Sequence, residues 1–497
     1  MRRLLLLLLV VTTTAVAQER WEGLELNASA SATASTGDVA PLWLTANRHG
    51  VASHRASSAY VRVAVSRDLQ TDSLRQWRLG YGLDIFAAAR HERTAAIQQA
   101  YAELGWRKLR LTLGARERHL EVQNDELSSG AMTFGINASP VPTARLDIDW
   151  FAIPSTHGWW QWRLYGSYGL MTDGTWQEQF AKAGTRYARN TRYHEKSLHW
   201  QFGRPDRFPF TYEIGLDMAS EFGGTSYNVK TLRANNNQLT TYHHGSGLRA
   251  YWNALTCQGS DATDGSNPNS SGNHLGNWVM QLRYHGQGWM ARAYWQRFFE
   301  DHSQLTVQYG IHDMLLGGEV TLPRNCFVSS VVVEYLNTRE QSGAVYHDAT
   351  PSLPEAMAGR DDYYNHKLYA GWQYYGMAVG NPLITSPLYN RQYVNDREQD
   401  NLYFYNNRVE AWHIGMSGDP SDQWHWRALA TFTRNWGIYT RPLDDAERQT
   451  SLMAEVSYTP WWCSGWQATL GAALDNGHLR GNSTGVQLTL SKSLKLN

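Results

Sequence analysis

The sequence has no run of 18 apolar residues after position 17, so no transmembrane helix is expected. Its only cysteines are Cys257, Cys326 and Cys463. An odd, sparse set of this kind excludes a disulfide framework, and no Cys-x-x-Cys or Cys/His spacing suggests a zinc site. Lys plus Arg equals Asp plus Glu, at 45 each, and no basic stripe offers a surface for nucleic acid. We therefore expect no metal, no cofactor and no nucleic-acid partner.

Catalytic motifs are also missing. The chain contains no Gly-x-Ser-x-Gly, no His-Glu-x-x-His and no P-loop. Glu300, Asp301 and His302 could supply acid and base groups, but neighbouring positions in a strand point to opposite faces. A hydrolase that uses Ser128 or Ser129 with a loop histidine stays open as an alternative. The sequence thus favours a protein that is not an enzyme.

The first 17 residues indicate export. Arg2 and Arg3 precede an apolar stretch from Leu4 to Val11, and residues 15–17 read Ala-Val-Ala. A basic start, an apolar core and an Ala-x-Ala site are typical of a secretory signal peptide, here cleaved after Ala17. The mature chain is then residues 18–497, and we expect it to lie in the outer membrane of a Gram-negative bacterium.

The mature chain is dominated by alternation of apolar and polar residues, in segments of roughly ten residues. In the segment 484–494, for example, Val486, Leu488 and Leu490 alternate with polar side chains. About twenty such segments follow one another, and each predicts a strand with one apolar face. The chain also has 22 Trp and 27 Tyr, rings that favour the boundary between water and lipid.

Two all-β architectures accommodate so many strands. A propeller repeats with a period near 40 residues, and this chain has no such period. Short turns mixed with long polar loops are instead typical of an antiparallel transmembrane barrel with an even number of strands. We assign strands forward from the N-terminus and backward from the C-terminus. The two assignments agree at about 18 strands if residues 131–136 and Gly371–Asn390 are left out of the wall. The predicted strands are 22–34, 57–69, 76–88, 96–105, 108–116, 143–152, 159–170, 195–204, 208–221, 276–285, 288–299, 315–322, 326–337, 402–416, 423–436, 449–459, 464–475 and 484–494.

The largest outer loops are predicted at about 222–275 and 338–401. The second contains Gly371–Asn390, which has no charged residue, three glycines, and prolines at 382 and 387 that prevent a long regular strand. We interpret this segment first as a plug that closes the barrel mouth, and second as a sugar site. In the loop 171–194, Trp176 and Phe180 are spaced for one face of a short helix, with Glu178 paired to Lys182.

Several motifs resemble a known family. They are Pro41–Gly50 (PLWLTANRHG), Leu127–Gly130 (LSSG) with Asn137–Pro142 (NASPVP), Gly272–Gly276 (GNHLG), Phe298–Ser303 (FFEDHS), Gly371–Asn390 and Asn407–Val409 (NRV). In this order they resemble the capsule assembly protein Wzi family, in the form found in the Bacteroides group. The chain departs from that form at Ser139, where the Asn-Ala-Arg-Pro pattern has arginine.

The resemblance implies an 18-stranded outer-membrane barrel that acts as a surface lectin. Its partner would be capsular or exopolysaccharide, which it would help to attach or assemble at the cell surface, and it would work as a monomer among outer-membrane lipids. A porin-like diffusion channel is the alternative function, because 16 to 18 strands leave an aqueous lumen unless it is filled.

Polysaccharide recognition uses aromatic faces and fixed polar groups, and the outer loops supply both. The candidate carbohydrate-binding residues are Trp43, Arg48, Glu300, Asp301, Asn365, Trp372, Asn381, Tyr389, Asn407 and Arg408. Each has a structural alternative, which is to hold the loops against one another and against the wall. Asn381 precedes Pro382 and suits a turn, whereas Arg408 suits an ion pair in the lumen.

Overall fold

The computed structural model describes residues 23–181, 184–230, 239–257, 272–300, 311–325, 327–347, 357–392 and 401–496. The predicted signal peptide, Asp301, Cys326 and Lys182 lie outside these ranges. Over the described ranges, no helix is both long and apolar enough to cross a bilayer.

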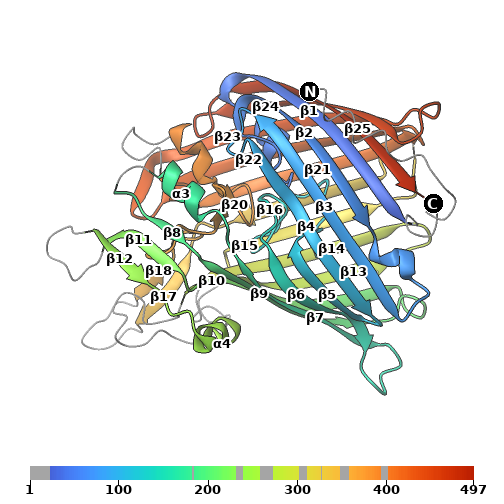
Figure 1. The fold of residues 1–497 in the computed structure, drawn as a ribbon, viewed down its shortest axis with the longest axis horizontal. Helices are drawn as coiled ribbons and strands as arrows, with labels where there is room; N and C mark the ends of the chain where they lie inside the picture. Colours follow the sequence, from blue (N-terminus) through green and yellow to red (C-terminus); the bar gives the residue numbers. More distant parts are fainter. Residues whose placement is uncertain are drawn as a thin grey trace, which may run out of the picture.

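The described chain forms one closed antiparallel barrel of 18 strands (Figure 1). The barrel closes where β1 pairs with β25, in a register that runs from Leu24 opposite Leu496 to Ser35 opposite Gly485. Leu24 and Leu496, where β1 begins and β25 ends, lie at the end with the short turns, called here the turn end, and the long connections lie at the opposite, outer end. The wall strands are β1 (Leu24–Val39), β2 (Arg55–Arg67), β3 (Trp77–Ala89), β4 (Ala95–Trp106), β5 (Leu109–Ala115), β6 (Thr143–Ala152), β7 (Trp160–Leu170), β9 (Arg192–Phe202), β10 (Phe210–Phe222), β13 (Asn273–His285), β14 (Met290–Glu300), β15 (Met314–Thr321), β16 (Ser330–Asn337), β21 (Val409–Ser421), β22 (Trp424–Ile438), β23 (Arg441–Tyr458), β24 (Trp466–Gly477) and β25 (Ser483–Leu496).

The alternating apolar and polar residues of each strand face opposite sides of the wall, with the apolar residues outside and the polar residues toward the lumen. In β25, Val486, Leu488 and Leu490 are 45–51% exposed on the outside, while Gln487 between them is buried toward the lumen. Apolar side chains that stay exposed around a whole barrel are stable in lipid and not in water. The turn end also carries a ring of exposed aromatics, among them Trp77, Trp289, Trp424 and Trp466. Such a ring matches the girdle that a transmembrane barrel places at the membrane surface.

The prediction of an 18-stranded barrel is confirmed, and each predicted strand overlaps a wall strand. Some boundaries were wrong. The strand predicted at 402–416 begins at Val409, and the one predicted at 449–459 already begins at Arg441. In the first case residues 401–408 turn into the lumen. In the second, the hairpin of β22 and β23 continues beyond the apolar band, where charged side chains hide the alternation although the backbone still pairs.

The two stretches left out of the wall are indeed absent from it. Residues 131–136 contain no strand, and Gly371–Asn390 forms only a small hairpin of β19 (Gln373–Tyr374) and β20 (Met377–Ala378), followed by the 3-10 helix η4 (Pro387–Gln392). Both stretches contribute to the main hydrophobic core, in which side chains of the loops inside the barrel pack against wall side chains such as Tyr193 and Phe298.

Other short elements gather at the outer end (Figure 1). The predicted helix is present as α3 (Gly174–Phe180), with Trp176 and Phe180 stacked at 4.9 Å. Of the described residues, Glu178 pairs with Arg189. The remaining outer elements are α2 (Leu42–Thr45), the sheet of β8 (Tyr187–Arg189), β11 (Thr225–Lys230) and β12 (Leu239–His243), the helix α4 (Leu248–Thr256), and the pair β17 (Ser342–His347) and β18 (Met357–Arg360).

Candidate functional site: the plug and the outer platform

The plug consists of three connections that fold into the lumen and share one hydrophobic core. The residues described for them are 40–54, 116–142, 361–392 and 401–408. Within Gly371–Asn390 every residue is buried except Tyr375, which is half-buried. Burying an ion without a partner costs far more than burying an apolar or amide side chain. The lack of charge in this segment is therefore what allows it to fill the barrel mouth.

Hydrogen bonds join the connections to each other. The Asn381 side-chain amide donates to the carbonyl of Gly130 at 2.8 Å, and the Trp372 indole donates to the carbonyl of Thr133 at 2.6 Å. Asn137 returns the contact by donating to the carbonyl of Ala378 at 2.9 Å. Buried polar groups paired in this way make the plug a specific structure rather than a collapsed loop.

The plug is also fixed to the wall at alternate strands along one side of the barrel, where β16, β21, β22, β23 and β24 are neighbours. The Trp43 indole donates to the hydroxyl of Thr431 on β22 at 3.0 Å. The backbone N–H of Ser129 donates to the carboxylate of Glu334 on β16 at 2.6 Å. The backbone N–H of Leu42 donates to the Asp475 carboxylate on β24 at 3.0 Å. The inward polar face of the wall thus supplies acceptors for the loop backbone.

Most of the predicted carbohydrate-binding residues belong to this plug. Trp43, Trp372, Asn381, Tyr389, Asn365 and Asn407 are between 0 and 6% exposed. Asn407 donates to the carbonyl of Tyr363 at 2.8 Å, and Asn365 donates to that of Phe404 at 2.9 Å. The structure therefore gives these six residues a packing role, and a direct role in sugar binding stays a prediction.

The other predicted residues lie at the edges of the plug. Arg48 forms an ion pair with Glu455 of the wall at 2.8 Å. Glu300 was expected in a loop, but it is the last residue of β14, where it accepts from the N–H of Tyr364 at 2.7 Å. Arg408 precedes β21 and places its guanidinium 3.9 Å from the ring centre of Tyr439. The ten predicted residues are thus not brought together on one surface.

A different set of side chains does form a surface. The hairpin of β19 and β20 turns at Tyr375 and Gly376, whose φ angles are +52° and +80°. Two left-handed residues define a type I′ turn, which normally selects Asn, Asp or Gly at its first position. A tyrosine there costs about 1–2 kcal/mol of backbone strain. Tyr375 is therefore a strained position at the partly buried tip of the hairpin.

The Tyr375 ring meets a cation and further aromatic rings. The Arg93 guanidinium lies 4.4 Å from its centre, and the Trp176 ring lies 5.9 Å away, edge-on. Trp176 stacks in turn on Phe180, and both rings are half-buried. This arrangement places partly buried aromatic rings beside a charged donor. Aromatic rings and charged donors are the groups that contact the C–H faces and hydroxyls of sugars.

Asp173 holds the helix α3 against the hairpin. Its carboxylate accepts from the backbone N–H of Tyr375 at 3.1 Å and from the side chain of Gln177 at 3.0 Å. Burial raises the pKa of Asp173 to about 6. Because this contact positions Trp176 next to Tyr375, the surface is assembled by a buried acid in the adjoining loop.

The same surface extends to the outer sheet. Tyr187 of β8 stacks on Tyr227 of β11 at 4.8 Å, and the Tyr187 hydroxyl donates to Glu178 of α3 at 2.9 Å. We call Arg93, Trp176, Phe180, Tyr187, Tyr227 and Tyr375 together the outer platform. Its residues come from four separate connections, namely 90–94, 171–191, 223–272 and 338–408.

The outer platform was not predicted, although the sequence contains two signals for it. The spacing of Trp176 and Phe180 predicts a helix face and no more, and Tyr375 is predicted only as part of the plug. The arginine absent at Ser139 was the other signal, because the Arg93 guanidinium donates to the Ser139 hydroxyl at 2.5 Å. The guanidinium of Arg93, in the turn between β3 and β4, thus lies at Ser139, where the family pattern has arginine.

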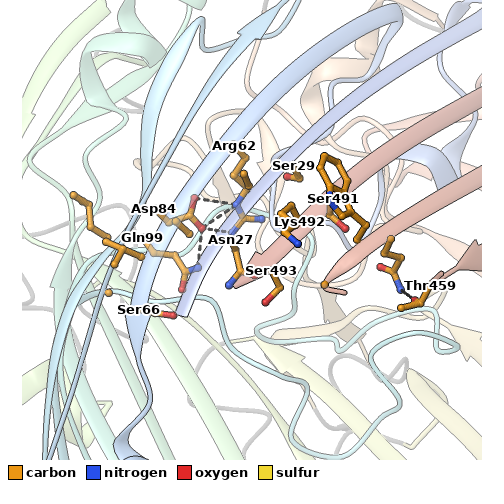
Figure 2. Close-up of a pocket in the computed structure, with 18 of the residues that line it drawn as sticks. Asn27, Ser29, Arg62, Ser66, Asp84, Gln99, Thr459, Ser491, Lys492 and Ser493 are labelled. Atoms are coloured by element: carbon orange, nitrogen blue, oxygen red, sulfur yellow. Dashed lines mark hydrogen bonds and ion pairs between the residues drawn. The ribbon is translucent and has the colours of Figure 1, made fainter. Parts of the chain in front are cut away.

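A hollow of about 570 Å³ lies in the turn-end half of the lumen. Figure 2 shows side chains that line it. Its lining includes Asn27, Ser29, Gln99 and the pair of Arg62 with Asp84. Arg62 also pairs with Glu117 of the plug at 2.8 Å. No three His, Cys, Asp or Glu side chains of the described residues are grouped so that they could hold a metal ion.

These features define a plugged 18-stranded β-barrel of the outer-membrane type. Its fold is similar to that of Escherichia coli Wzi, described as a carbohydrate-binding β-barrel involved in group 1 capsule assembly, with a TM-score of 0.55 and 11% identity over 97% of this chain and 86% of that one. The similarity expected from the sequence motifs is thereby confirmed for the fold.

Other similar structures are Pseudomonas aeruginosa OccK5 and OprD. Their TM-scores are 0.47 and 0.44, at 8% and 7% identity, and each match covers 95% of this chain and 97% or 92% of the other. No protein-family model and no curated protein matches the sequence.

Proposed function

We propose that this protein is an outer-membrane lectin that binds capsular or exopolysaccharide on the outer platform and helps to attach it to the cell surface. The observation that carries the proposal is the strained, half-exposed Tyr375, flanked by Arg93 and Trp176 at the tip of a filled barrel. The described carbohydrate binding of Wzi, a barrel of similar fold, supports the same assignment. In this proposal the signal peptide is removed after Ala17, and the long loops face outward as in other transmembrane barrels.

The predicted site residues have a defined part in this proposal. Trp43, Trp372 and Asn381, with the other buried members, hold the plug, and the plug holds the hairpin that presents Tyr375. Recognition then uses rings and a guanidinium that are already in position, which lowers the entropy lost on binding. Because the platform draws its rings from several loops in a row, it suits a long polymer better than a small molecule.

The test is binding of the purified protein to the polysaccharide of its own source organism. Tyr375→Ala and Trp176→Ala should each weaken binding about tenfold, roughly 1.4 kcal/mol. Trp461→Ala is the matched control, because Trp461 is 78% exposed at the turn end. Cells that carry the platform variants should retain less polysaccharide while the barrel still inserts. Unchanged binding by both variants would contradict the proposal.

A diffusion channel is the second candidate, favoured by the hollow of about 570 Å³ in the turn-end half of the lumen. The two functions differ in conductance. A barrel closed by the plug should show no steady openings in a planar bilayer, whereas a channel should show large ones. The channel would be favoured by two results together: steady openings from the unchanged protein, and normal polysaccharide binding by the Tyr375→Ala and Trp176→Ala variants.

A further inference from the structure

The helix α4 (Leu248–Thr256) lies outside the barrel wall, away from the plug. It contacts β9 and β10 near their outer ends, where it is visible beside the wall in Figure 1. It belongs to the long connection between β10 and β13 that also contains β11 and β12. Neither the barrel fold nor polysaccharide binding explains why this connection sends a helix down the outside of the wall.

Outward-facing residues of the wall hold the helix in place. The Lys196 amine of β9 donates to the carbonyl of Ala254 at 3.1 Å and lies 3.2 Å from the Cys257 sulfur. A cation at the C-terminal end satisfies carbonyls that a helix leaves free. Cys257, which directly follows α4, packs with Met218 of β10 and Phe299 of β14. The helix is therefore docked in a fixed orientation.

The face turned away from the wall is apolar. Leu248, Trp252 and Leu255 are 89%, 57% and 40% exposed, and their spacing of four and three residues forms one stripe along the helix. Ala254 and Cys257, which meet the wall, are 1% and 5% exposed. Three large apolar side chains in a row on one face mark an interaction surface.

The position of α4 along the wall, relative to the apolar band, indicates what its apolar stripe contacts. An apolar band about 25 Å tall crosses roughly ten residues of a strand tilted by about 40°. Phe210 starts β10 beside the exposed aromatics Phe208 and Trp289 at the turn end. Ten residues further, the band ends near Ser220. Cys257 contacts Met218, just inside that limit, so the apolar stripe continues the lipid-facing surface of the wall.

We propose that α4 is an interfacial helix that lies in the outer leaflet of the membrane. Leu248, Trp252 and Leu255 enter the acyl chains, and the exposed Arg249 lies among the polar headgroups. Since β11 in the same connection carries Tyr227 of the outer platform, the helix ties one side of the platform to the membrane surface. The partner of this stripe is lipid, and not a protein or a glycan.

The test measures the surroundings of one label at Leu248. Leu248→Cys is made in the full-length chain with Cys326 and Cys463 changed to serine, while the buried Cys257 is kept. The protein is labelled with an environment-sensitive fluorophore in bilayers of outer-membrane lipid alone. Gln179→Cys on the exposed side of α3 is the aqueous control, and Leu282→Cys, 46% exposed on the wall, is the lipid control.

The Leu248 label should follow the lipid control: strong quenching by a nitroxide on the lipid acyl chains, and quenching by aqueous iodide at least fivefold weaker than at position 179. If iodide quenches positions 248 and 179 equally, the stripe faces water and the proposal is overturned in favour of a protein or glycan partner. Trp252→Cys gives the same readout should the first variant fail to fold, which heat-modifiable electrophoretic mobility reports. Because the bilayer contains no polysaccharide, the outcome is independent of the lectin proposal.

Discussion

Removal of the Trp372 side chain should open the barrel without unfolding it. Trp372 is fully buried, its indole donates to the Thr133 carbonyl at 2.6 Å, and its ring stacks on Tyr193 of the wall at 5.6 Å. Trp372→Ala leaves a large cavity, which costs about 3–5 kcal/mol. The stranded carbonyl of Thr133 adds about 1–3 kcal/mol.

This cost falls on the plug, because the wall is held by its own closed ladder of backbone hydrogen bonds. A loss of about 4 kcal/mol raises the ratio of open to closed barrels by about a thousandfold. In a planar bilayer, Trp372→Ala should therefore show frequent steady openings that the unchanged protein lacks. Trp461→Ala is the control, since that tryptophan is 78% exposed and far from the plug.

The result that refutes this reasoning is a Trp372→Ala protein that inserts normally and stays closed. It would show that the plug is held by its contacts with the wall, and that its own core contributes little. A variant that fails to insert at all would instead show that the plug and the wall fold as one unit.

Three other changes test the same structure. Gly380→Ala should open the barrel, because an added Cβ would lie 2.3 Å from the Met132 carbonyl and this overpacking costs about 1–3 kcal/mol. Gly318→Ala is the control: its added Cβ would have its nearest neighbour at 4.0 Å, so this variant should conduct like the unchanged protein. Asp173 has a pKa of about 6 in the folded protein against 3.8 in the unfolded chain, so its buried neutral form stabilises the docking of α3 below pH 4. This contribution of about 3 kcal/mol is lost as the pH rises through 6. Proteolysis of the outer loops should therefore accelerate over that pH range in the unchanged protein and not in Asp173→Asn. Arg48→Ala should destabilise the plug by about 1–3 kcal/mol because it removes a charged hydrogen bond to Glu455, and equal thermal melting of Arg48→Ala and Arg48→Lys would show that the charge has no effect.

The wall could be predicted because its physics is local. A strand in lipid needs an apolar residue at every second position, so alternation predicts about twenty strands, and the requirement for an even number in a closed barrel reduces them to 18. Gly371–Asn390 could be predicted as a plug because an uncharged segment with two prolines suits burial but not a long strand. The start of β23 at Arg441 could not be predicted, because strand pairing continues there above the apolar band and charged residues hide the alternation.

The functional surface could not be predicted in this way. Arg93, Trp176, Tyr227 and Tyr375 lie far apart in the sequence, and nothing in their local patterns relates them. Their meeting depends on how four connections fold over one barrel mouth. Residues such as Trp372 and Asn381 have the chemistry of sugar ligands, yet the fold uses that chemistry for packing.

By itself, the sequence determined the barrel, the number of its strands and the segment that plugs it, because alternation and the absence of charge act on neighbouring residues. The tertiary structure decided which aromatic rings stay at the surface and that α4 lies against the outside of the wall. Those outcomes depend on contacts between residues far apart in the sequence, such as Tyr168 with Tyr251 and Arg93 with Tyr375, and no local pattern encodes them.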